Sequence, residues 1–138
     1  MVLLHDGGMA TIAAARGGLK AYQDSVRLPT AELVKELREL LGAKLVAYIG
    51  SVKETRAVRQ WIEGDREPSA AATNRLRVAY HVAALLAERD SPAVVQAWMQ
   101  GMNPQLDDVA PARLLRDGNL DDVGPAVLAA ARAFSSAS

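Results

Sequence analysis

The sequence predicts an all-α fold. Ala, Leu and Arg, which favour helices, are abundant among the 138 residues, and half of all residues are hydrophobic. The apolar residues recur three and four positions apart, and no run alternates apolar and polar residues as a half-buried strand does. Glycines and prolines divide the chain at intervals that suit short helices. We therefore expect helices joined by short turns.

The first 28 residues fit two descriptions equally well. One is a short helix from Met9 to Arg16, and the other is a partly flexible arm interrupted by paired glycines at 7–8 and 17–18. We treat residues 1–28 as an N-terminal arm.

The signals become clearer from Pro29 onward. The hydroxyl of Thr30 is expected to cap a helix over residues 31–41, and Gly42 suits its end. One side of this helix carries an apolar stripe of leucines, namely Leu33, Leu37, Leu40 and Leu41.

Two short helices and one long helix are predicted next. The short helices should cover residues 43–49 and about 53–63, and Gly64 should end the second of them. Ser69 follows a proline and marks the start of the long helix, which should reach about residue 88. One side of the long helix is apolar and consists of Leu76, Ala79, Tyr80, Ala83 and Leu86. Residues 29–89 are thus predicted to form one domain.

A second helical domain is predicted over residues 90–138. Ser91 and Pro92 pair a capping hydroxyl with a proline at the first helical position, where its missing N–H costs nothing. The helix that they start should end near Gly101. Its expected buried residues are Val94, Val95 and Trp98.

Two further helices should complete this domain. The first begins at Pro111 and ends before Gly118. The second runs from about Asp121 to Phe134, accepts Pro125 in its first turns, and leaves residues 135–138 frayed.

The neutral total charge hides an uneven distribution. The 16 basic residues balance the 16 acidic ones. Residues 1–52 hold six basic and five acidic side chains, residues 53–77 hold six and four, and residues 88–138 hold four and seven. The middle of the chain is therefore mildly basic and its last third is acidic.

Three short helices in a row, with Gly50 between the second and the third, are the layout of a helix-turn-helix, whose last helix lies in the major groove of DNA. On that helix Val58, Trp61 and Ile62 have the spacing of a core-facing stripe. The residues predicted to face DNA are Lys53, Thr55, Arg56, Arg59 and Gln60, with Arg66 in the following loop.

These residue types suit nucleic acid. Arginine and lysine donate to phosphates and guanine edges, and the glutamine amide can pair with adenine. We expect Arg75 and Arg77, on the next helix, to add to the same basic face. By periodicity alone, an ordinary solvated polar face is an equally good interpretation.

Two blocks of sequence resemble known families. The run RQWIEGDREP, from Arg59 to Pro68, resembles the DNA-reading helix and following loop of Xre-type repressors. The C-terminal third is similar to the toxin-binding domain of the MbcA/ParS/Xre antitoxin family. The residues that carry this second likeness are Trp98-Met99, Asn103-Pro104, Leu106, Pro111, Leu114-Leu115-Arg116-Asp117-Gly118 and Val123. Together the two likenesses cover residues 30–134.

The resemblance implies an antitoxin of a type II toxin–antitoxin pair. Such a protein represses its own operon. Its C-terminal domain binds a RES-domain toxin, which consumes NAD⁺, and this domain covers the entrance to the toxin's active site. It implies a homodimer on operator DNA and a higher-order complex with the toxin. Carried over by position, toxin contact falls on Arg113, Arg116, Asp117, Leu128, Arg132 and Phe134.

Two other functions fit the same residues. One is a stand-alone transcriptional regulator whose C-terminal domain dimerises or binds a ligand. The other is a protein-interaction module whose helix-turn-helix does not bind DNA.

Catalysis and metal binding are not expected. His5 and His81 have no nucleophile or ligand partner at a meaningful spacing. The adjacent carboxylates at 107–108 and 121–122 point apart along the backbone, and both pairs precede expected helix starts, where acidic residues are ordinary. We therefore expect no enzyme activity, no cofactor and no metal.

The chain also lacks the features of a secreted or membrane protein. It contains no Cys, which excludes disulfides and fits a reducing compartment. No apolar run approaches the roughly 18 residues of a membrane span. A cytoplasmic protein without a membrane partner is the expectation.

Overall fold

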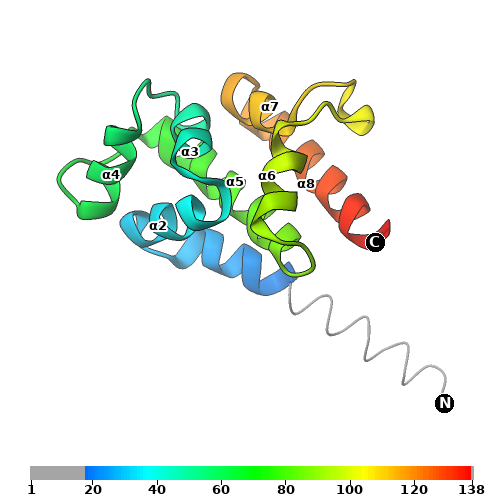
Figure 1. The fold of residues 1–138 in the computed structure, drawn as a ribbon, viewed down its shortest axis with the longest axis horizontal. Helices are drawn as coiled ribbons and strands as arrows, with labels where there is room; N and C mark the ends of the chain where they lie inside the picture. Colours follow the sequence, from blue (N-terminus) through cyan, green and yellow to red (C-terminus); the bar gives the residue numbers. More distant parts are fainter. Residues whose placement is uncertain (1–17, 138) are drawn as a thin grey trace, which may run out of the picture.

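The computed structural model describes residues 18–137, which are all-α as predicted (Figure 1). Residues 18–27 are helical. The elements that follow are α2 (Thr30–Leu41), α3 (Ala43–Ile49), α4 (Thr55–Glu63), α5 (Ala70–Ala87), α6 (Pro92–Gln100), the 3₁₀ turn η1 (Pro104–Leu106), α7 (Pro111–Asp117) and α8 (Leu120–Ala137).

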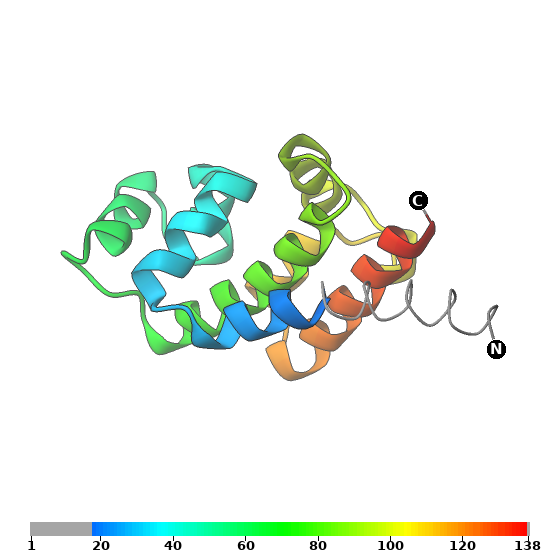
Figure 2. The ribbon, with the colours of Figure 1, turned by 90° about the horizontal axis from the view of Figure 1, so that it is seen from below.

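Helix α5 is the centre of the molecule. It contacts α2 and α3 from the first half of the chain and α6, α7 and α8 from the second. Helix α4 and the C-terminal end of α8 lie at opposite ends of the molecule (Figure 2). The two predicted domains therefore meet along one shared helix.

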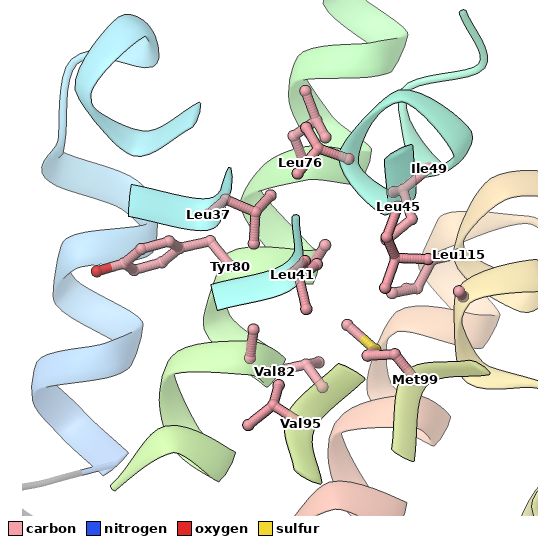
Figure 3. Close-up of a cluster of buried hydrophobic side chains, with 14 of the residues drawn as sticks. Leu37, Leu41, Leu45, Ile49, Leu76, Tyr80, Val82, Val95, Met99 and Leu115 are labelled. Carbon is pink, nitrogen blue, oxygen red and sulfur yellow. The ribbon is translucent and has the colours of Figure 1, made fainter. Parts of the chain in front are cut away.

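The buried side chains form one continuous core. Figure 3 shows Leu41 of α2 between Leu37 of the same helix and Leu115 of α7, with Val95 and Met99 of α6 below it. All five are at most 2% exposed. Because apolar burial is the main stabilising term in folding, each predicted domain depends on the other for part of its core.

One of the two predicted hydroxyl caps is confirmed, and Ser69, predicted only to start the long helix, also acts as a cap. The Oγ of Ser69 accepts from the N–H of Ala72 at 3.1 Å, and that of Ser91 accepts from the N–H of Val94 at 3.3 Å. The predicted cap at Thr30 is wrong. Thr30 is already helical, and its Oγ1 accepts instead from the Nη2 of Arg77 at 3.3 Å.

The buried face of α6 differs from the prediction. Val95 is fully buried as expected, but Val94 is 38% exposed and Trp98 is only partly buried. The second fully buried residue is Met99, four positions after Val95. Since α6 packs against α2, α5 and α7, the direction of those neighbours decides which face is covered.

The helix at residues 18–27 was not predicted. Ala21 and Ser25, one turn apart, are each 4% exposed. The carbonyl of Ser25 accepts from the Nη1 of Arg77 on α5 at 3.0 Å, and Tyr22 stacks at a tilt on His81 with ring centroids 5.6 Å apart. This part of the expected arm is therefore packed on the fold. The alternative helix from Met9 to Arg16 lies outside the described residues, as does His5.

His81 predicts how stability depends on pH. Burial and, secondarily, the charge of Arg132 lower its pKa from the usual 6.5. The unfolded chain thus binds a proton at a higher pH than the folded one. The stability that His81 contributes is present above pH 6.5 and is lost as the pH falls below it. We expect the thermal midpoint to fall between about pH 7.5 and about pH 5.5, and to fall less in His81→Gln. An equal fall of the thermal midpoint in the unsubstituted protein and in His81→Gln would contradict this.

Candidate nucleic-acid interface

Helix α4 is held by one buried face. Ala57, Val58 and Trp61 are 7%, 0% and 3% exposed and pack towards α2 and α3, while Ile62 is partly buried. The opposite side of α4 carries Arg56 and Arg59, which are exposed. The predicted division between core-facing and outward-facing residues is confirmed.

Trp61 lies directly against the turn that precedes α4. A Cβ atom on Gly50 would come within 2.9 Å of the Cη2 of Trp61, closer than real Cβ atoms approach. The backbone of Gly50 has φ −72°, a value that any residue adopts, so glycine is required here for space. The close approach fixes how deeply α4 sits on α3.

A hydrogen-bonded arginine fixes the other side of the same turn. Arg75 of α5 donates from Nε to the carbonyl of Ile49 at 2.9 Å and from Nη2 to the carbonyl of Gly50 at 3.1 Å. These carbonyls end α3 and would otherwise lack helical partners. The expectation that Arg75 and Arg77 add to the basic outer face is wrong, because both side chains turn inward to backbone and hydroxyl acceptors.

The turn over residues 50–54 also contains an unusual backbone conformation. Ser51 has φ 59°, a left-handed value rare for residues other than glycine. Its N–H donates to the carbonyl of Tyr48 at 3.1 Å, and the N–H of Val52 donates to that of Ala47 at 3.0 Å. At the far end of α4, Gly64 has φ 80° and ends the helix as predicted.

Four of the six predicted DNA-facing residues meet in one hollow. Its volume is about 430 Å³, and Lys53, Arg56, Gln60 and Arg66 line it. Thr55 lines a neighbouring hollow of about 870 Å³, into which Lys53 and Arg56 also extend. Arg59 is exposed on the same helix but lines neither hollow.

Two residues of this region were not predicted from the sequence. Lys44 and Tyr48 of α3 line the larger hollow, and the guanidinium carbon of Arg116 from α7 lies 4.5 Å from the centroid of the Tyr48 ring. Lys44 and Tyr48 are four residues apart, so helical spacing alone could have placed them on one face. Their proximity to Arg116 arises from the packing of α3 on α7.

The six residues proposed for toxin contact do not form one surface. Arg113, Arg116 and Asp117 are exposed on α7, and Arg116 faces α3. On α8, Leu128 is partly buried against the core, and Arg132 is exposed beside His81 and Tyr22 in a separate hollow.

Phe134 belongs to a third surface. It is 37% exposed, and its ring lies 6.3 Å from that of Trp98. The two aromatic residues line an apolar groove of about 430 Å³ between α6 and α8. Met102, 80% exposed, lies at the same groove.

Residues 18–137 contain no group of three or more His, Asp or Glu side chains placed to hold a metal ion. Within the same range, every helix is too short or too polar to cross a lipid bilayer. No family model, curated protein or solved structure matches the chain.

The contact between Gly50 and Trp61 gives a test of how α4 is positioned. Gly50→Ala should destabilise the protein by about 1–3 kcal/mol, because the added methyl group overpacks the turn against the indole ring. Urea unfolding would measure the change.

Gly18→Ala is the matched control for this substitution. Gly18 lies in the helix at 18–27, and its added Cβ would meet the Cδ1 of Leu85 at an ordinary 3.7 Å. Alanine favours a helix over glycine, by up to about 1 kcal/mol, so this change should leave stability equal or higher. Equal destabilisation by the two substitutions would refute the steric role of Gly50.

Proposed function

We propose that the protein binds DNA through α4. The observation that carries this proposal is the outer face of α4, where Arg56 and Arg59 are exposed and Gln60 is partly exposed. Packing of the opposite face holds the helix in place. Figure 1 shows α4 at one end of the molecule, where the groove of a duplex has access to it. A helix of this kind fits the width of the major groove.

The residues divide into two kinds of contact. Lys53 precedes α4, Arg66 follows it, and the two line one hollow, so they suit phosphates beside the bases that α4 reads. Arg59 and Gln60 lie between them and suit base edges, the arginine for guanine and the glutamine for adenine. We propose that the protein acts as a homodimer on a two-fold symmetric operator, as the family resemblance implies.

Arg59 tests the proposed base contact. Arg59→Ala should lower the affinity for an operator fragment by about 1–3 kcal/mol and relax the base preference at one position of each half-site. Fluorescence anisotropy on fragments selected in vitro would measure both effects.

Arg27→Ala is the matched control, because Arg27 is an exposed arginine on the helix at 18–27. It should change neither the affinity nor the base preference. If the two variants bind alike, α4 is not the reading helix.

We propose further that the same chain is an antitoxin and that its partner is a RES-domain toxin. Two features support this proposal. One is the likeness of the C-terminal third to the MbcA/ParS/Xre family. The other is the apolar groove between α6 and α8, where Met102 is 80% exposed and Phe134 is 37% exposed. Exposed apolar groups beside a groove are typical of protein-binding surfaces. By binding there, the toxin would place its NAD⁺ site against this chain.

Substitutions at the groove test the antitoxin proposal. Deletion of the end of α8 is unsuitable, because Val127, Ala130 and Ala131 belong to the shared core. Met102→Asp and Phe134→Asp should instead release the toxin, since each places a charge in the apolar contact. Coexpression with a RES-domain toxin gene next to this one, with cellular NAD⁺ as the readout, measures neutralisation.

Val26→Asp is the control, because Val26 is 54% exposed on the helix at 18–27, away from the groove. It should neutralise the toxin fully. If both groove variants also keep NAD⁺ at its normal level, the groove does not bind the toxin. If no such toxin exists and DNA binding holds, the protein is a stand-alone regulator.

A further inference from the structure

The hollows beside α4 continue across α3 to α7. Helix α3 contacts α4 on one side and α7 on the other, and Figure 1 shows it between them. The hollow of about 870 Å³ extends from Lys53 and Arg56 to Arg116, and a smaller one of about 290 Å³ is lined by Arg113. Lys44 lines both of them. The two hollows therefore form one surface that runs over three helices.

This surface gathers positive charge on a neutral protein. Together with the hollow at Arg66, its lining includes six cationic side chains, and in the described part of the chain Glu54 is the only carboxylate that lines it. The six residues, which we call the basic surface, are Lys44, Lys53, Arg56, Arg66, Arg113 and Arg116. The whole chain balances 16 basic against 16 acidic residues, so the excess is local.

Arg116 is oriented by its neighbours. Its guanidinium carbon lies 4.5 Å from the centroid of the Tyr48 ring, which directs the side chain across α3 towards the residues of α4. The side chain is still 39% exposed, so its N–H groups remain accessible to a ligand. An arginine stacked on an aromatic ring loses less conformational freedom when it binds an anion.

Asp117 does not neutralise these arginines. Its carboxylate lies 3.9 Å from the Nε of Arg113 and 3.6 Å from that of Arg116, and it is 61% exposed. Exposed ion pairs of this length contribute little, so both guanidinium groups can still bind a phosphate. The negative charge of Asp117 lies beside them and should weaken that binding.

We propose that Arg113 and Arg116 of α7, together with Lys44 of α3, bind the phosphate backbone of the same DNA duplex that α4 reads. This inference rests on the proposed DNA binding by α4. It assigns to DNA two side chains that the family resemblance assigns to the toxin. Phosphate contacts add affinity without base preference, so α7 lengthens the bound segment and leaves its recognition to α4.

Salt dependence measures these contacts directly. Affinity falls with salt, and each neutralised phosphate makes the plot of log affinity against log salt steeper by about 0.9. Arg113→Ala/Arg116→Ala should therefore make this plot shallower by about 1.8. Between about 50 and about 200 mM salt, the affinity of the unsubstituted protein should fall about tenfold more than that of the variant. Fluorescence anisotropy on an operator fragment gives both numbers.

Three further variants sharpen the test. Arg27→Ala/Arg132→Ala removes two exposed arginines outside the basic surface and should leave the slope unchanged. Arg113→Lys/Arg116→Lys removes the stacking of the guanidinium on Tyr48 but keeps both charges, so it should retain most of the slope. Asp117→Asn should tighten binding, because it removes the carboxylate next to both arginines.

The outcomes separate this inference from the proposed function. If Arg59→Ala weakens binding but Arg113→Ala/Arg116→Ala matches the control double variant, the α7 contact is wrong and DNA binding by α4 stands. If the unsubstituted protein shows no salt-dependent binding, both proposals fail. If the α7 variant loses only toxin binding, α7 is a protein-binding surface and the inference is overturned.

Discussion

The contact between the indole ring of Trp61 and the backbone of Gly50 determines where α4 lies. A helix of nine residues has too little internal stability to hold its own position, so packing must supply it. The ring fills the space that a side chain at position 50 would need, and Arg75 binds the carbonyls on the other side of the same turn. The outward direction of Arg56 and Arg59 follows from the packing of α4, because Ala57, Val58 and Trp61 bury its opposite face against α2 and α3.

Local signals in the sequence predicted most of the helices, and tertiary packing decided what they missed. Ser69 and Ser91 act as caps because the N–H groups that they accept lie within the same turn. Thr30 has the same chemistry, but a guanidinium from α5, far along the chain, binds its hydroxyl. The prediction that Val94 is buried is wrong for a related reason, because the helices packed against α6 determine which face of α6 is buried.

The candidate site shows the same difference between what local sequence signals predict and what tertiary packing decides. The 3.6-residue period of one helix predicted that Arg56 and Arg59 point outward from α4 and that Trp61 points inward. No such period could bring Arg116 onto Tyr48, because the two residues lie on different helices and meet only when α7 packs on α3. A binding surface made from several helices becomes visible only in the folded chain.

The central position of α5 has a consequence for protein turnover. Its two sides support both halves of the core, and the chain passes from α5 to α6 through residues 88–91 alone. A protease that acts on transiently opened chains would find, within residues 18–137, no linker at which to release one half intact. Degradation would then remove every activity of the molecule in a single event, so its cellular lifetime would control all of them together.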